Sequence, residues 1–97
     1  MQALEMARFR VAPERVTEMR EKRKVALEAL RGEFPGLVSE QLVRLDERTW
    51  MDLIVWDTRE TADTAAERAP QIPEAAAYFG ALDEVVAMEH GEVVHSG

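Results

Sequence analysis

The chain has 97 residues, of which 46% are hydrophobic and 32% charged, a composition typical of one folded domain spanning residues 1–97. Lys and Arg number 12 against 19 Asp and Glu, so the formal net charge is −7 and nucleic acid is not an expected partner. The absence of cysteine excludes disulfides and thiolate chemistry. No segment resembles a signal peptide or a membrane span, so we expect a cytoplasmic protein with no membrane partner.

The first half of the chain predicts a strand, a helix and a second strand. The first strand covers about residues 2–11, and Pro13 suits the first turn of the helix that follows. Apolar residues recur at helical spacing up to Gly32, which we expect to end this helix. The turn signal Phe34-Pro35-Gly36 then precedes a strand over 37–45.

The second half predicts a hairpin, a helical segment and a last strand. Residues 46–48 connect to a strand over 50–56. Asp57 or Thr58 can cap the next helix, and Asp57-Thr58-Arg59-Glu60 fits the spacing of a capping box, in which Glu60 reaches back to a free backbone N–H. The helical segment covers 61–82 and is broken by its two prolines, and the last strand covers 85–90. The order β-α-β-β-α-β predicts a ferredoxin-like α+β fold, an antiparallel sheet with helices on one face. The bare sheet face indicates a partner, most simply a second copy in a homodimeric α+β barrel.

The strand over 50–56 alternates between two chemically different faces. One face is uniformly apolar and consists of Met51, Leu53 and Val55; the other consists of Trp50, Asp52, Ile54 and Trp56. A face that packs only against helices rarely carries an aspartate, because an unpaired buried charge is costly. We therefore expect the apolar face to contact the helices and the Trp/Asp/Ile/Trp face to lie on the bare side of the sheet.

Three stretches resemble the signature of a known family. They are Pro35-Gly36-Leu37, Val55-Trp56-Asp57-Thr58-Arg59-Glu60-Thr61-Ala62 and the terminal Met88-Glu89-His90-Gly91-Glu92-Val93. Together they resemble antibiotic biosynthesis monooxygenase-like proteins, which are dimeric α+β barrels. The haem-degrading branch of that family carries an Asn where this chain has Ala7, and a Trp and a His that are missing from residues 62–77. The resemblance therefore implies no haem, and no clustered ligands indicate another cofactor or a metal.

The resemblance also implies an activity. The cofactor-independent branch places a Trp in its cavity with an Asn four residues earlier, and those positions are Trp56 and Asp52 here. This implies a monooxygenase that oxidises an electron-rich aromatic, an anthrone or quinol, in a cavity between sheet and helices. Asp52 would be the general base and His90 a proton shuttle. Substrate contacts are expected from Trp56, Trp50, Ile54 and Glu5.

Less specific interpretations stay open for each of these residues. Asp52 can be a structural aspartate held by Arg44 or Arg48, Trp56 a plug at the end of the barrel, and His90 and Glu5 structural. Whether the protein is an enzyme at all is equally open. A non-catalytic dimeric barrel that binds a small hydrophobic molecule, or an isomerase or cyclase on the same scaffold, fits the same sequence.

Overall fold

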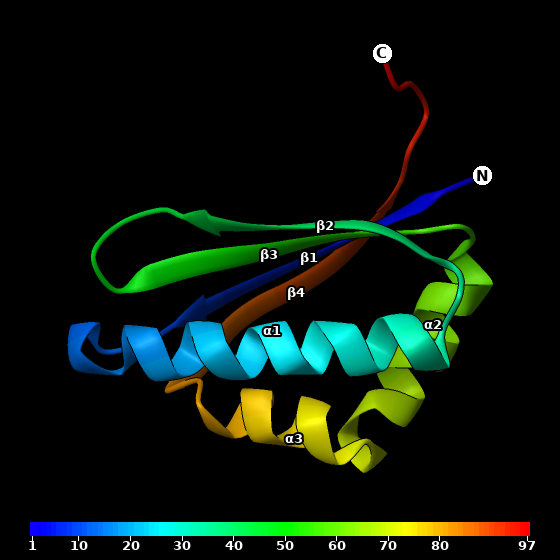
Figure 1. Cartoon of the computed structure of the whole chain (residues 1–97). Coiled ribbons are helices and arrows are strands. Elements are labelled where there is room, and N and C mark those ends of the chain that lie inside the picture. Colours follow the sequence, from blue (N-terminus) through cyan, green and yellow to red (C-terminus); the bar gives the residue numbers. More distant parts are fainter.

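One antiparallel sheet and the helices on one of its faces make up the computed structural model, which describes all residues 1–97 (Figure 1). The elements are β1 (Ala3–Arg10), the 3-10 turn η1 (Pro13–Arg15), α1 (Val16–Glu33), β2 (Leu37–Arg44), β3 (Thr49–Trp56), α2 (Arg59–Arg68), the 3-10 turn η2 (Ala69–Gln71), α3 (Pro73–Gly80) and β4 (Glu84–Glu92). The strand order is β2-β3-β1-β4. This confirms the predicted ferredoxin-like α+β fold. None of the helices combines the length and the apolar character needed to cross a membrane.

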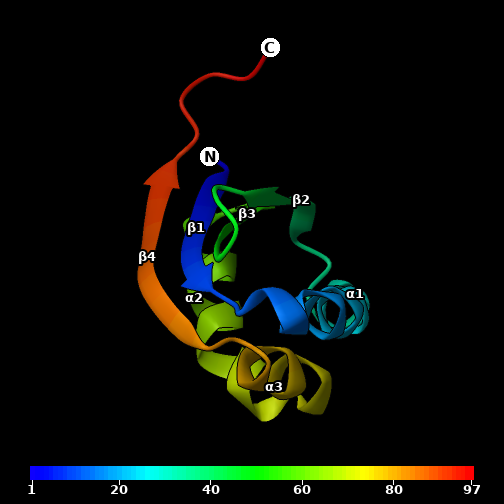
Figure 2. The same ribbon diagram turned by 90° about the vertical axis from the view of Figure 1, so that its left-hand side faces the viewer.

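The two central strands are β1 and β3, and β2 and β4 form the edges of the sheet (Figure 2). All neighbouring strands pair antiparallel, with Ala7 opposite Asp52 on β3 and opposite Met88 on β4. A register shift between Arg8 and Phe9 interrupts the pairing of β1 with β4. The sheet therefore brings side chains from both halves of the chain onto the face that the helices cover.

The long helix α1 packs on the sheet through one stripe of side chains. The buried members of this stripe are Met19, Arg23, Ala26, Leu27 and Leu30. The helix continues through Gly32 to Glu33, so the predicted end at Gly32 was wrong. The helix ends one residue later, at Glu33, because Phe34 is buried in the core and its N–H donates to the Leu30 carbonyl at 2.8 Å.

The short helix α2 lies close to the sheet because its buried residues are small. Ala62 is fully buried and Ala65 nearly so. Of the two predicted caps it is Thr58 that caps the helix, since its hydroxyl accepts a hydrogen bond from the Thr61 N–H at 3.0 Å. The expected return contact from Glu60 is replaced by the Thr61 hydroxyl, 3.0 Å from that of Thr58, because the third helical residue is Thr61.

The two faces of β3 are the reverse of the prediction. Burial alternates along the strand, and its buried members, Trp50, Asp52, Ile54 and Trp56, face the helices. The half-buried Met51, Leu53 and Val55 lie on the bare face of the sheet. The prediction failed because it treated Asp52 as an unpaired charge, whereas α1 and α3 supply partners that compensate it.

Candidate functional site

A cavity of about 260 Å³ lies between the helix-covered face of the sheet and the helices. Its walls are apolar and include Phe9, Ile54, Trp56, Leu30, Ala65, Tyr78 and Met88. Its only charged lining residues are Glu5 from β1 and Asp52 from β3. Val85 and Met88 line the cavity and yet are 56% and 53% exposed, which places its mouth along edge strand β4. The cavity can therefore hold a small hydrophobic molecule beside two carboxylates.

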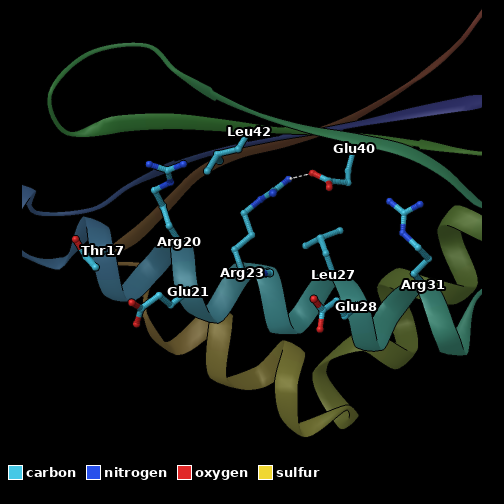
Figure 3. A pocket seen from close by; sticks show the side chains of 10 residues that line it. Thr17, Arg20, Glu21, Arg23, Leu27, Glu28, Arg31, Glu40 and Leu42 are labelled. Atoms are coloured by element: carbon cyan, nitrogen blue, oxygen red, sulfur yellow. Dashed lines mark hydrogen bonds and ion pairs between the residues drawn. The ribbon is translucent and has the colours of Figure 1, made fainter.

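Asp52 is held by partners from two helices. The Arg23 Nε atom on α1 donates to Asp52 Oδ1 at 2.7 Å, and the Tyr78 hydroxyl on α3 donates to Asp52 Oδ2. Arg23 also donates through Nη2 to Glu40 Oε1 on β2 at 2.7 Å, as the dashed line in Figure 3 marks. These four residues, Glu40, Arg23, Asp52 and Tyr78, are called the Asp52 network below. Both oxygens of Asp52 thus accept hydrogen bonds within the protein.

The electrostatics of the Asp52 network follow from its burial. Burial raises the pKa of Asp52, and the Arg23 charge and the Tyr78 hydroxyl oppose this only in part. Burial acts to lower the pKa of Arg23, but the charge of Asp52 and the bonds to both carboxylates raise it overall. Burial, together with Asp52, raises the pKa of Tyr78 far above its ordinary value, so Tyr78 keeps its proton.

A second, polar hollow of about 580 Å³ lies outside the cavity, between α1 and edge strand β2. In Figure 3, Arg20 and Arg31 extend from α1 toward β2 on either side of Arg23. Arg23 lines this outer groove, whereas its partner Asp52 lines the cavity. The Arg23–Asp52 ion pair therefore forms part of the wall between the polar groove and the apolar cavity.

Glu5 is the centre of a second group of side chains. The Trp56 Nε1 atom donates to Glu5 Oε1 at 3.3 Å, and His90 Nε2 lies 3.6 Å from the same oxygen. No protein group donates to Glu5 Oε2, and His90 Nε2 is buried without a hydrogen-bond partner. Burial raises the pKa of Glu5, Asp52 adds to this effect, and His90 and Trp56 oppose it. These three residues, Glu5, Trp56 and His90, are called the Glu5 cluster below.

The structure gathers most of the predicted site residues and separates two of them. Asp52, Ile54, Trp56 and Glu5 line the cavity. His90 pairs with Glu5 across the β1–β4 ladder but does not line the cavity. Trp50 is buried beneath the Arg44 guanidinium, 5.3 Å from its ring centroid, and does not line the cavity.

The partners of Asp52 were not among the predicted site residues. Neither Arg44 nor Arg48 contacts Asp52, and the ion pair is made by Arg23 instead. One signal was present in the sequence, because Arg23 occupies the same helical stripe as Met19 and Leu30, a position where an arginine needs a buried partner. Tyr78 gave no such signal. No group of three or more His, Cys, Asp or Glu side chains is placed to hold a metal ion.

The fold and cavity together define a ferredoxin-like α+β protein with an apolar cavity whose lining includes two carboxylates. The chain belongs to the antibiotic biosynthesis monooxygenase family, whose model matches residues 3–79. Among curated proteins, none has a significantly similar sequence.

Solved structures share this fold at low sequence identity. A candidate antibiotic biosynthesis monooxygenase from Caulobacter crescentus is 16% identical with a TM-score of 0.79, over 97% of this chain and 91% of that one. SnoaB, a cofactor-independent oxygenase from Streptomyces nogalater, is 19% identical with a TM-score of 0.67, over 99% and 95%. A dimeric ferredoxin-like protein from an uncultured marine organism is 13% identical with a TM-score of 0.75, over 99% and 90%. At these identities the likeness shows the fold alone.

Proposed function

We propose that the protein is a cofactor-independent monooxygenase that oxidises an electron-rich aromatic of the anthrone or quinol type. The observation that carries the proposal is the apolar cavity in which two desolvated carboxylates are the only charged lining groups. Membership of the antibiotic biosynthesis monooxygenase family supports it, as does the fold shared with a cofactor-independent oxygenase.

The chemistry needs a base, a dry site and dioxygen. A carboxylate removes a proton from the activated carbon or hydroxyl of the substrate, leaving an electron-rich anion. This anion reduces dioxygen and combines with it to form a peroxide at the same carbon. In an anthrone, loss of water from the peroxide converts the methylene to a carbonyl, so one oxygen atom enters the substrate and the other leaves as water. The substrate itself supplies all the electrons.

Glu5 is better placed than Asp52 to accept the proton. Both oxygens of Asp52 already accept hydrogen bonds, whereas Oε2 of Glu5 receives none from the protein. The raised pKa of Glu5 brings it nearer to a neutral working pH, where a general base is most effective. We therefore assign proton acceptance to Glu5, with His90 acting through it, and keep Asp52 as the second candidate base.

The aromatic walls hold the substrate ring. Trp56 and Ile54 line the cavity on the sheet side, and Phe9 meets Tyr78 edge-on with ring centroids 6.2 Å apart. Stacking on such walls stabilises bound substrate and transition state about equally, so it contributes more to binding than to the chemical step. Trp50 has no part in this wall, since it lies outside the cavity lining.

We propose in addition that two chains form a homodimer through the bare sheet face. Its apolar residues are Leu4 and Met6 of β1 with Met51, Leu53 and Val55 of β3, paired across the ladder and only half-buried in one chain. An apolar sheet face of this kind is covered most simply by the same face of a second copy. The prediction of a dimer thus stays, but it rests on the face of β3 opposite to the one first chosen.

Oxygen uptake with a reduced anthrone such as 1,8-dihydroxyanthrone tests the proposal. Wild type should consume oxygen above the rate of spontaneous oxidation, and Glu5→Gln should lose this rate by about 10²–10⁴-fold, the usual contribution of a general base. Loss of the rate in Asp52→Asn alone would instead make Asp52 the base. Trp56→Phe should raise KM more than it lowers kcat. Glu67→Gln, an exposed charge on α2, is the matched control.

Two further measurements, ligand binding and turnover without oxygen, distinguish the alternatives. A wild-type protein that binds anthrones and quinols without consuming oxygen would be a non-catalytic binding protein. Conversion of a substrate under strict exclusion of oxygen would identify an isomerase or cyclase.

A further inference from the structure

We propose that the cavity selects neutral aromatic ligands that donate a hydroxyl hydrogen bond to Glu5, and rejects ligands that carry a carboxylate. The inference rests on the proposed function only in taking this cavity as the substrate site, and it adds which charge and which polar group the substrate carries.

The hydrogen-bonding groups on the cavity wall are the first reason. The Tyr78 hydroxyl already donates to Asp52, and the Trp56 Nε1 proton is directed to Glu5. No lining side chain therefore has an uncommitted donor for an anion, whereas Glu5 Oε2 is an uncommitted acceptor. A ligand hydroxyl satisfies this acceptor with its single proton, while a carboxylate finds no donor at all.

The charges around the cavity are the second reason. Glu5 and Asp52 are the only charged lining residues, and the Arg23 guanidinium faces the outer groove on the far side of Asp52. The helices contribute only uncharged side chains to the lining. Because Arg23 compensates Asp52, the repulsion comes from Glu5: an anionic ligand would approach its carboxylate in a site of low dielectric with no cationic lining residue, where like charges repel strongly.

A cationic ligand is also a poor match for this wall. An ammonium group carries three donors, and the cavity offers it the single uncommitted oxygen of Glu5 among apolar surfaces. The charge of Asp52 is already compensated by Arg23 at 2.7 Å. Taking an ammonium group out of water with two of its donors unpaired is costly, so we expect a neutral hydroxyl to bind better.

Selectivity against carboxylates should depend on pH. The ionisable groups that face Glu5 are Asp52 on β3 and His90 on β4. Burial raises the pKa of Glu5 overall; Asp52 raises it further, and His90 lowers it. As the pH falls through this raised pKa, Glu5 becomes a neutral donor. A carboxylate ligand should then bind better relative to the hydroxyl ligand, up to the point where the ligand itself is protonated.

Three matched probes test the inference by isothermal titration calorimetry on the intact protein at pH 7.5. They share one ring system and differ in the polar group: 2-naphthol, 2-naphthoate and 2-(aminomethyl)naphthalene. We expect 2-naphthol to bind and 2-naphthoate to bind about tenfold more weakly or worse. In Glu5→Gln the carboxamide removes the charge and supplies a donor, so the affinity for 2-naphthoate should rise about tenfold while that for 2-naphthol falls. Glu67→Gln should change neither affinity.

Several results would overturn the inference. One is that wild type does not bind 2-naphthol, or binds 2-naphthoate equally well. Another is that 2-(aminomethyl)naphthalene binds more tightly than 2-naphthol. The last is that Glu5→Gln leaves the ratio of the 2-naphthol and 2-naphthoate affinities unchanged. Circular dichroism confirms that the variant is folded; if it is not, the three-probe comparison and its pH dependence in wild type decide the matter. Binding is measured without turnover. Absence of oxygen uptake would refute the monooxygenase activity but not this selectivity. Equal binding of all three probes would refute the selectivity but not the monooxygenase activity.

Discussion

The substitution Tyr78→Phe isolates one hydrogen bond of the Asp52 network. It removes the hydroxyl that donates to Asp52 Oδ2 and keeps the aromatic ring, which meets Phe9 edge-on at 6.2 Å. Tyr78 is only 4% exposed and Asp52 only 5%, so water replaces the lost donor poorly. Hydrogen bonds to charged groups contribute about 1.5–3 kcal/mol, and we expect the free energy of unfolding to fall by about 2 kcal/mol.

Urea unfolding followed by tryptophan fluorescence at one fixed protein concentration measures this loss. The chain contains a single tyrosine, so the control is the same substitution in an Asp52→Asn background, where the charged acceptor is already absent. There the loss should shrink by about 1 kcal/mol or more, the coupling expected of a direct contact. A loss below about 0.5 kcal/mol, or one that is equal in both backgrounds, would refute a hydrogen bond to an ionised Asp52.

The pH dependence of this variant gives a second check. The hydroxyl of Tyr78 lowers the pKa of Asp52, so its removal should raise that pKa above the wild-type value, which burial has already raised. When the pKa of a carboxyl group is higher in the folded than in the unfolded state, its protonation stabilises the folded state. The stability of Tyr78→Phe should therefore approach that of wild type as the pH falls through the raised pKa of Asp52. A difference that grows toward acidic pH would contradict this assignment.

Two further predictions concern the sheet face and the turn before β2. In sedimentation equilibrium, wild type should have the mass of two chains and Leu53→Asp the mass of one, because the variant places a charge in the proposed dimer face. A one-chain mass for wild type would disprove the dimer. Gly36→Ala should lower the free energy of unfolding by about 1–3 kcal/mol, since the added methyl group would meet Asp57 Oδ1 at 2.6 Å and Thr61 Cγ2 at 2.8 Å. An unchanged urea midpoint would show that these side chains move aside.

Local patterns in the sequence were sufficient for the order and type of the elements. Apolar spacing places α1, alternation places β3, and the cap candidates Asp57 and Thr58 place the start of α2 to within one residue. Each of these depends on interactions between residues close in sequence. The element order then leads to the ferredoxin-like fold, and the motif resemblance leads to the family that the chain belongs to. Among the element boundaries, the end of α1 at Glu33 depended in addition on the burial of Phe34 in the core.

Which face of β3 meets the helices was decided only by tertiary structure. The alternation along β3 separates Asp52 from Leu53 onto opposite faces but does not show which face is covered, since both faces are largely apolar. The decision depends on whether a partner for Asp52 exists. That partner is Arg23, which lies 29 residues away along the chain and reaches Asp52 only once α1 is docked on the sheet.

The composition of the Glu5 cluster was likewise beyond the sequence. Alternation in β1 puts Glu5 on the same face as Phe9, but its neighbours follow from the register of two different strand pairings. The β1–β4 pairing places His90 opposite Glu5, and the β1–β3 pairing brings Trp56 within reach of the same carboxylate. A carboxyl pKa depends on burial and on charges a few ångströms away, so the chemistry of Glu5 was determined only when these distant segments came together.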